Sequence, residues 1–328
     1  MRAVQEEGLT KAETLAQFNA VVGVADVSLS VNRGEIFCVM GLSGSGKSTL
    51  VRHFNRLLEP TAGKIEIEGT DVMALKPAEL QQFRNRRIGM VFQNFALLPH
   101  RSVLDNVAMP LEIRQMSKND RMRHAAAILD IVELGAWGSK FAHELSGGMQ
   151  QRVGLARALA ANPDVLLMDE PFSALDPLIR RQLQDEFLRL SKIMKKTTVF
   201  ITHDLDEAVR IGNRIAIMHD GRVVQIGTAE DIVMNPADDY VADFVAGISR
   251  LKIVRAHVVM QPLDEYLANN APIPTDTQRV SEDEMLSTLI EMAIDSDSAI
   301  VVQSGNTDVG VITRKDILRT VIEGADVS

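Results

Sequence analysis

Four short runs of uninterrupted apolar residues recur through the first two thirds of the chain. They lie at residues 36–40, 88–92, 165–168 and 198–202. Apolar runs of this length, without polar alternation, are typical of strands buried on both faces of a parallel sheet. Segments with apolar residues at helical spacing separate the runs. This alternation predicts an α/β fold with a mostly parallel sheet.

Shorter segments have the pattern of antiparallel strands. Residues 21–31 and 63–69 alternate between apolar and other positions with a period of two. Residues 215–218 and 223–226 flank Asp220-Gly221, a dipeptide that favours a tight hairpin turn. These segments predict an antiparallel β subdomain and a hairpin at one edge of the main sheet.

A helical pattern occupies the middle of the chain from Val103 to about Trp137. It predicts a helical subdomain, spanning about residues 100–160, inserted between strands of the sheet. Residues 1–17 mix Glu, Lys, Ala and Leu in a pattern that is more helical than strand-like.

The pattern of the first domain ends near Gly247. We therefore expect one domain over residues 1–247 and a small α+β domain over residues 248–328. The elements expected in the second domain are a strand at 251–260, a helix that begins after a capping box formed by Ser281 and Glu284, strands at 299–302 and 309–312, and a helix at 314–323.

Composition limits the possible partners. The 328 residues include 35 Lys and Arg against 44 Asp and Glu, so nothing global attracts nucleic acid and we expect none as a partner. Cys38 is the only cysteine, which excludes disulfides within the chain. No apolar segment approaches the ~20 residues needed to span a bilayer, and the polar N-terminus does not resemble a signal peptide. We expect a cytosolic protein, although one docked on a membrane partner would have the same composition.

The first candidate site is residues 41–49, which fit the phosphate-loop pattern of Gly, four residues, Gly, Lys and Ser or Thr. An apolar strand precedes the loop and a helical pattern follows it, which argues against a chance glycine-rich turn. Glycines let backbone N–H groups turn toward phosphates, and the helix start adds its positive dipole end. Lys47 would hold the β- and γ-phosphates, and Ser48 would ligate Mg²⁺. The residues expected to bind nucleotide here are Gly41, Ser43, Gly44, Ser45, Gly46, Lys47, Ser48 and Thr49.

Three later features also indicate chemistry. Glycines at residues 145–152 precede a helical pattern, and a helix start invites an anion. Asp169 and Glu170 end an apolar strand, where burying an acidic side chain is energetically unfavourable unless a cation lies nearby. His203 ends the next apolar strand, and Asp176 opens a long amphipathic helix.

In order and spacing, these features together with Gln93 resemble the ATP-binding-cassette (ABC) ATPases, a class of P-loop NTPases. A phosphate loop alone would also admit GTPases and kinases, but no Asn-Lys-x-Asp guanine motif is present. The resemblance implies that Asp169 holds Mg²⁺ and that Glu170 polarises the attacking water as general base. It also implies that Gln93 senses the metal and the water, and that His203 contacts the γ-phosphate.

The resemblance implies a second copy of the chain as well. In this family Ser146, Gly147 and Gly148 bind the γ-phosphate held by the partner, so two ATP molecules are sandwiched in a head-to-tail homodimer. Asp176 would couple the two sites across that interface. It is also placed to cap the helix that begins at Pro177, and both roles are compatible.

Five stretches narrow the resemblance to the ATPases of glycine betaine and proline betaine importers. They are residues 41–46, 94–100, Met149, 176–180 and 203–207. The resemblance covers about residues 21–247. It implies an ATPase at the cytoplasmic face of the bacterial inner membrane, bound to integral membrane permease subunits. An extracytoplasmic solute-binding protein would deliver the solute to those permease subunits. A choline importer ATPase and a soluble cassette protein outside transport are the alternatives.

The last domain resembles a cystathionine-β-synthase-type (CBS) regulatory module, most clearly at residues 308–318. Residues 250–275 are interpreted as the remnant of a second repeat. The resemblance implies sensing of ionic strength or of a nucleotide. The alternative is a domain that only helps the ATPase to dimerise.

The adenine-stacking aromatic residue of the family has two candidate positions. Phe18 has suitable spacing upstream of the phosphate loop. Alternatively, residues 5–20 are an insertion, the aromatic residue lies before Met1, and Phe18 is a packing residue. We favour the second interpretation.

Overall fold

The computed structural model describes residues 11–269, 277–296 and 298–322. The chain divides into two compact units, Met1–Ile226 and Gly227–Ser328. The division falls earlier than the boundary expected after Gly247, because helix α10 (Ala229–Met234) packs with the second unit. Met234 lies against the second hydrophobic core, and Arg255 N donates to Glu230 Oε1 at 2.8 Å.

The first unit contains a six-stranded sheet with the order β4-β5-β6-β1-β7-β8. Its strands are β1 (Ile36–Met40), β4 (Ile88–Val91), β5 (Val165–Asp169), β6 (Thr197–Ile201), β7 (Arg214–His219) and β8 (Arg222–Gly227). The pairs β4–β5, β5–β6, β6–β1 and β1–β7 are parallel. The two-residue turn at Asp220-Gly221, with φ values of 47° and 81°, joins β7 to β8. The predicted mostly parallel sheet with a hairpin edge is confirmed.

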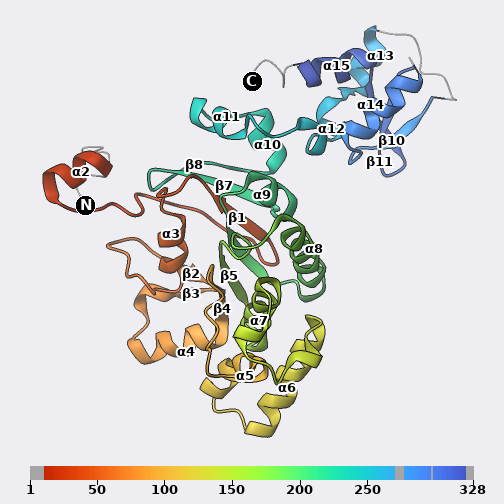
Figure 1. The fold of residues 1–328 in the computed structure, drawn as a ribbon. Helices are drawn as coiled ribbons and strands as arrows, with labels where there is room; N and C mark the ends of the chain where they lie inside the picture. Colours follow the sequence, from red (N-terminus) through yellow and green to blue (C-terminus); the bar gives the residue numbers. More distant parts are fainter. Residues whose placement is uncertain (1–10, 270–276, 297, 323–328) are drawn as a thin grey trace. The chain divides into compact units, whose positions relative to one another are not determined.

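Both faces of this sheet are covered by helices, which explains the uninterrupted apolar runs (Figure 1). Alternate residues such as Phe37 and Ile201 pack with α3 (Lys47–Phe54) and α4 (Pro77–Arg87). On the other face, the ring centroid of Phe200 lies 6.1 Å from that of Phe187 on α8 (Pro177–Met194). Helix α9 (Leu205–Ile211) packs against β1.

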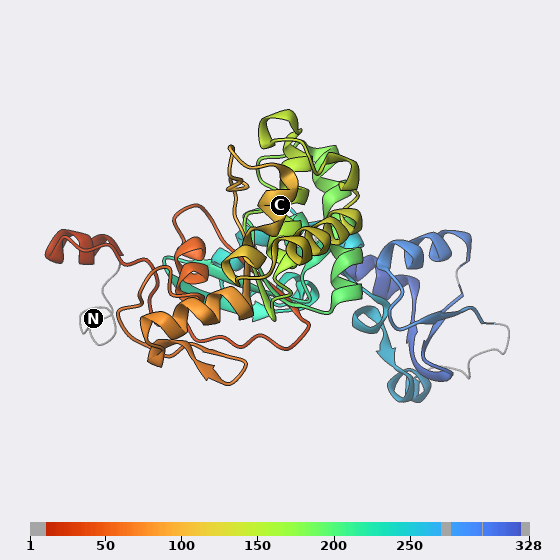
Figure 2. The same ribbon diagram turned by 90° about the horizontal axis from the view of Figure 1, so that it is seen from below.

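The predicted helices of the middle segment are present. They are α5 (Val103–Ile113), α6 (Lys118–Ile131) and α7 (Gly147–Ala160), with 3-10 turns at Gly135–Trp137 and Ala142–Glu144. The three helices pack on one another, and α5 and α6 lie together at one end of the first unit in both views (Figures 1 and 2). Ser102 and Ser117 cap α5 and α6 by accepting from Asp105 N and Asp120 N. None of the described helices is long and apolar enough to cross a membrane.

The antiparallel part of the first unit is smaller than expected. It consists of β2 (Glu66–Ile67) and β3 (Thr70–Asp71), followed by a 3-10 turn at Val72–Ala74. Residues 21–31, predicted as a strand, form none, because no described strand pairs with them. Val27, Leu29 and Val31 nevertheless pack against the core, which accounts for the alternating pattern. At the N-terminal end, α2 spans Lys11–Phe18, and the rest of the expected helical segment lies outside the described residues.

The second unit has a four-stranded sheet with the order β10-β11-β12-β9. Its strands are β9 (Gln261–Pro262), β10 (Arg279–Ser281), β11 (Ile300–Ser304) and β12 (Thr307–Ile312), and its further helices are α11 (Asp239–Val245), α12 (Ala256–Val259), α13 (Leu263–Asn269), α14 (Leu286–Asp295) and α15 (Arg314–Ile322). Strand β10 is parallel to β11, whereas β12 is antiparallel to both of its neighbours. The expected strands at 299–302 and 309–312 and the closing helix are therefore present.

Two local predictions in the second unit are wrong. Residues 251–260 form a 3-10 turn (Arg250–Lys252) and helix α12, because their apolar side chains enter the core from helical turns. The capping box of Ser281 and Glu284 does not form. Ser281 belongs to strand β10, its Oγ accepts from Asp283 N at 3.3 Å, and Met285 occupies the N-cap position of α14.

Candidate functional site

The phosphate loop connects the end of β1 to the start of α3, as the sequence predicts. Gly41 and Gly46 have φ values of 148° and 105°, in the region that side chains rarely adopt. A Cβ on Gly46 would lie 2.2 Å from Gly23 O, and one on Gly41 would lie 2.1 Å from Met218 O. The loop therefore requires glycine at both positions.

Lys47 lies at the centre of this loop. Its Nζ donates to Gly41 O at 2.7 Å and to Leu42 O at 3.0 Å. Burial lowers the pKa of Lys47, while the charges of Glu170 and Asp169 act in the opposite direction. Among the described residues, the ammonium group donates to these carbonyl groups alone. A phosphate group bound in the loop would therefore pair with a partly desolvated cation.

Two oxygen groups suited to Mg²⁺ lie next to the loop. Ser48 Oγ donates to Asp169 Oδ1 at 2.8 Å, and Arg52 Nη2 lies 3.5 Å from Asp169 Oδ2. Asp169 is only 5% exposed at the end of β5. A hydroxyl and a buried carboxylate are ligands that Mg²⁺ takes when phosphates and water complete its shell, so these residues fit the ion. Ser45 Oγ is buried without a hydrogen-bond partner in the described structure, which adds an unused polar group to the loop.

Glu170, His203 and Gln93 meet at one carboxylate oxygen. His203 Nδ1 lies 3.0 Å from Glu170 Oε2, and Gln93 Nε2 lies 3.4 Å from the same atom. Gln93 Nε2 also lies 3.3 Å from Ser173 Oγ. Glu170 has a φ of 46°, and its N–H donates to Ile201 O at 3.1 Å, so the next strand fixes its backbone. Thus the three residues expected to be catalytic come together from three separate loops.

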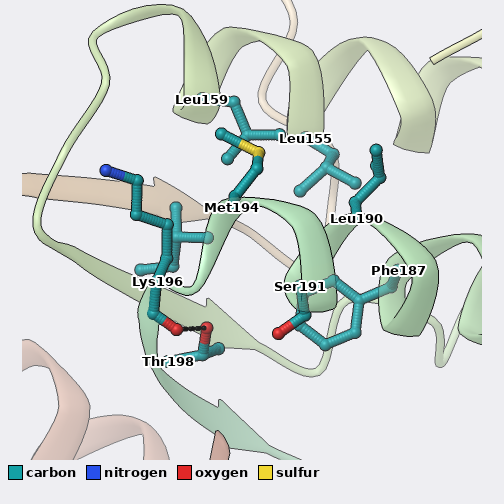
Figure 3. A pocket seen from close by; sticks show the side chains of 9 residues that line it. Leu155, Leu159, Phe187, Leu190, Ser191, Met194, Lys196 and Thr198 are labelled. Carbon is teal, nitrogen blue, oxygen red and sulfur yellow. Dashed lines mark hydrogen bonds between the residues drawn. The ribbon is translucent and has the colours of Figure 1, made fainter. Parts of the chain in front are cut away.

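A hollow surrounds this carboxylate. Its lining residues are Glu170, Phe172, Ser173, Arg180, Thr202, His203, Asp204 and Glu207. A separate pocket between α7 and α8 is lined mainly by Leu155, Leu159, Phe187, Leu190 and Met194 (Figure 3). Apolar side chains dominate that second pocket, and its polar lining residues are Ser191, Lys196 and Thr198.

A second polar network, which includes lining residues of the hollow, was not predicted from the sequence. Arg180 Nη1 donates to Asp204 Oδ2 at 3.1 Å, and its Nη2 donates to Leu175 O at 3.1 Å. One turn later on α8, Gln184 Nε2 donates to Glu207 Oε1 at 2.9 Å. Burial raises the pKa of Glu207, and its hydrogen bonds oppose that shift. The i, i+4 spacing of Arg180 and Gln184 is the sequence signal that indicates a shared contact with α9.

The residues expected to complete a partner's site lie at the starts of two helices. Ser146 caps α7 by accepting from Met149 N at 3.4 Å, and Asp176 caps α8 by accepting from Ile179 N at 3.1 Å. Ser146, Gly147 and Asp176 are exposed, whereas Gly148 is buried. Within the described ranges, no hydrogen bond joins Ser146, Gly147 or Gly148 to the phosphate loop. One chain therefore does not bring these two sets of residues together.

The remaining predicted residues are placed as follows. In the loop, Ser43 and Gly44 are exposed, and a Cβ on Gly23 would lie 2.9 Å from Thr49 Cγ2. Phe18 is 58% exposed at the end of α2, so its interpretation as a packing residue is wrong. Cys38 is fully buried, and burial, followed by the charge of Glu207, raises the pKa of its thiol, as suits a core residue.

Comparisons with known proteins identify the family of this chain. Residues 24–173 match the family described as ABC transporter. The glycine betaine/proline betaine transport system ATP-binding protein ProV of Escherichia coli (strain K12) is 46% identical over 319 residues, which are 97% of this chain and 77% of that protein. The trimethylamine N-oxide transport system ATP-binding protein TmoW of Ruegeria pomeroyi is 55% identical over 239 residues, covering 73% of this chain and 70% of that protein.

A more distant relative and a solved structure complete the comparison. The choline transport ATP-binding protein OpuBA of Bacillus subtilis (strain 168) is 40% identical over 297 residues, covering 88% of this chain and 75% of that protein. The dimeric structure of the ATP-binding cassette MJ0796 bound to ADP and Pi has a TM-score of 0.58 and 36% identity, covering 63% of this chain and 90% of that chain. On this likeness of sequence and fold, the chain belongs to the ATP-binding proteins of ABC transporters, which hydrolyse ATP to drive transport.

Proposed function

We propose that this protein is the ATP-hydrolysing subunit of an importer for glycine betaine, proline betaine and related quaternary ammonium solutes. The convergence of His203 and Gln93 on Glu170, beside the Ser48–Asp169 pair, carries this proposal. A carboxylate with a histidine and an amide at hydrogen-bond distance is equipped to orient and deprotonate a water molecule. ProV, the relative matched over 97% of this chain, is named for glycine betaine/proline betaine transport.

Each group has a distinct task in the proposed reaction. Lys47 and the loop amides hold the β- and γ-phosphates, and Ser48 and Asp169 hold Mg²⁺, which neutralises phosphate charge. Glu170 accepts the proton of the attacking water. Gln93 orients that water, and its 3.4 Å contact with Glu170 Oε2 keeps the two groups together. The contact of His203 Nδ1 with Glu170 orients the imidazole ring, so that the ring's other nitrogen can donate toward the γ-phosphate.

A head-to-tail homodimer completes the proposed site. Ser146, Gly147 and the start of α7 are exposed, and a helix N-terminus attracts phosphate. Because these groups make no contact with the phosphate loop of their own chain, they are available to a second copy. Asp176 would lie near that interface. Integral membrane permease subunits, fed by a solute-binding protein, would hold the dimer at the cytoplasmic face of the bacterial inner membrane.

The second unit is proposed to be a CBS-type regulatory module. Its elements from β10 to α15 follow the order strand, helix, strand, strand, helix, and β10 is parallel to β11. A single such module would act through pairing with its copy in the dimer. The test replaces residues 308–318 in the full-length protein and measures ATPase activity as a function of ionic strength. Loss of the response to ionic strength in a variant that still dimerises would support a sensing role over a purely dimerising one.

Substrate choice separates the candidates within the importer class. The similarity to trimethylamine N-oxide and choline relatives makes these solutes the specific alternatives to betaine. The test is uptake of labelled glycine betaine, choline and trimethylamine N-oxide by cells that carry this protein with the permease and binding protein of its genetic neighbourhood. We expect betaine uptake that the Glu170→Gln variant abolishes. Uptake of only choline or only trimethylamine N-oxide would reassign the substrate, and no membrane partner at all would favour a soluble cassette protein.

A further inference from the structure

Arg157 is a buried cation on α7 that contacts no carboxylate. It is 6% exposed. Its Nη1 donates to Ala96 O at 2.5 Å, and its Nη2 donates to Phe95 O at 2.8 Å. None of the ion pairs formed among the described residues includes it, and desolvation by burial lowers its pKa. A buried charge without a carboxylate partner is unfavourable unless other polar groups stabilise it. The two carbonyl groups that Arg157 contacts therefore indicate its structural role.

Both of these carbonyl groups belong to residues in an uncommon backbone conformation. Phe95 and Ala96 have φ values of 54° and 51°, and neither is glycine. Consecutive residues with side chains remain in this left-handed region only where their surroundings hold them. Ala96 is exposed, so its side chain is not what holds it. The guanidinium of Arg157 is the group that contacts both carbonyl oxygens.

Arg157 is itself fixed relative to the strand that leads into this loop. Helix α7 lies close to β4, because a Cβ on Gly89 would lie 2.8 Å from Ala158 O. Strand β4 ends at Val91, two residues before Gln93, and the strained residues follow directly after Asn94. Gln93 therefore lies between strand β4, which packs on α7, and the loop whose carbonyl groups accept hydrogen bonds from Arg157 on α7.

We propose that Arg157 is a positioning residue for Gln93: it holds the loop that follows Gln93 in its left-handed conformation and fixes that loop to α7. Helix α7 begins at the residues proposed to face the partner's nucleotide, so Gln93 and Ser146–Gly148 would move as one body. The proposal rests on the proposed role of Gln93 in hydrolysis. It predicts that ordering of the loop, rather than nucleotide affinity, depends on Arg157.

The test uses Arg157→Lys in the full chain. Lysine keeps the charge but lacks the planar fork that reaches two carbonyl oxygens together. Assayed well below the unfolding temperature of the variant, kcat for ATP hydrolysis should fall about tenfold while KM for ATP stays within about threefold, since the phosphate loop is intact. Hydrogen exchange of the amides of residues 94–97 should become at least about tenfold faster.

A second substitution tests whether strain is the reason. Ala96→Gly removes the penalty of positive φ at an exposed position. Alone it should leave kcat within about twofold, and combined with Arg157→Lys it should recover most of the lost kcat. The matched control is Arg114→Lys, because Arg114 Nε also donates to a carbonyl, Asn85 O at 2.9 Å, but not to one in the loop that follows Gln93. That control should change kcat by less than about twofold.

Three results would overturn the proposal: an unchanged kcat in Arg157→Lys, a lowered kcat with unchanged exchange at residues 94–97, or no recovery by Ala96→Gly. If Arg157→Lys does not fold, Arg157→Gln, which keeps one donor, replaces it in the same assays. Gln93→Ala separates this inference from the proposed function. If Gln93→Ala hydrolyses ATP normally, the role of Gln93 fails, whereas the exchange measurement still decides whether Arg157 holds the loop.

Discussion

His203 Nδ1 lies 3.0 Å from Glu170 Oε2, and 57% of the His203 side chain is exposed against 17% for Glu170. The carboxylate is therefore partly enclosed while the imidazole reaches into solvent. This arrangement leaves the other ring nitrogen free to meet a phosphate, and keeps the carboxylate next to where a water would attack. The predictions below follow from this geometry and from the contacts around it.

Glu170→Gln should abolish turnover, with kcat lowered by at least about 100-fold, because an amide does not accept the proton of the attacking water. The groups that bind ATP remain, so ATP-dependent dimers should persist. Phosphate release and size-exclusion chromatography measure the two properties. Normal turnover would remove Glu170 as the base, and loss of dimers would show that it also has a binding role.

His203→Ala should slow hydrolysis by about 100-fold, since it removes the donor proposed to stabilise developing charge on the γ-phosphate. Binding of ATP should change by less than about threefold, because the imidazole has no contact with Lys47 or the loop. Steady-state kinetics with a fluorescent nucleotide titration separates these effects. A raised KM with unchanged kcat would instead make His203 a simple binding residue.

Ser48→Ala should raise the Mg²⁺ concentration for half-maximal ATPase activity about tenfold, because it removes the hydroxyl proposed to ligate Mg²⁺ beside Asp169. Nucleotide binding without Mg²⁺ should stay within about threefold. Ser191→Ala is the control, since Ser191 lies in the separate apolar pocket between α7 and α8. An unaltered Mg²⁺ requirement in Ser48→Ala would contradict the assignment of this ligand.

The sequence predicts the site better than it predicts the small second unit. The phosphate loop and the ends of β5 and β6 depend on local patterns, since a buried strand followed by Gly, Asp or His has few structural alternatives. Residues 251–260 look like a strand, but their apolar side chains enter the core from helical turns. The contact of Arg157 with Phe95 and Ala96 joins residues far apart in the chain, and no local pattern reveals it.

Gly148→Ala and Gly147→Ala should differ in stability although the residues are neighbours. A Cβ on Gly148 would lie 2.6 Å from Ile179 Cγ2, whereas one on Gly147 would lie 3.4 Å from Leu175 Cδ2. The tighter contact forces α7 away from α8 and should cost about 1–3 kcal/mol. Thermal unfolding should show a lower Tm for Gly148→Ala only. Equal Tm values would mean that the helix starts relax without cost.

Glu207→Gln should stabilise the protein increasingly as pH rises. Burial raises the pKa of Glu207 in the folded state above its unfolded value. Folding therefore favours the protonated form, so there is no penalty below the unfolded pKa, and stability is lost as pH rises through the folded pKa. Glutamine cannot ionise, and it still offers an oxygen to Gln184.

The gain in Tm of Glu207→Gln over the wild type should therefore be larger at pH 8 than at pH 4.5, as measured by thermal unfolding across that range. Glu291→Gln, at an exposed position of α14, is the control and should show no such trend. A Tm difference that stays constant with pH would mean that Glu207 remains ionised at little cost, with Thr202 and Gln184 compensating for its burial. A Tm for Glu207→Gln that falls below the wild-type value at high pH would mean that the charge itself stabilises α9 against α8.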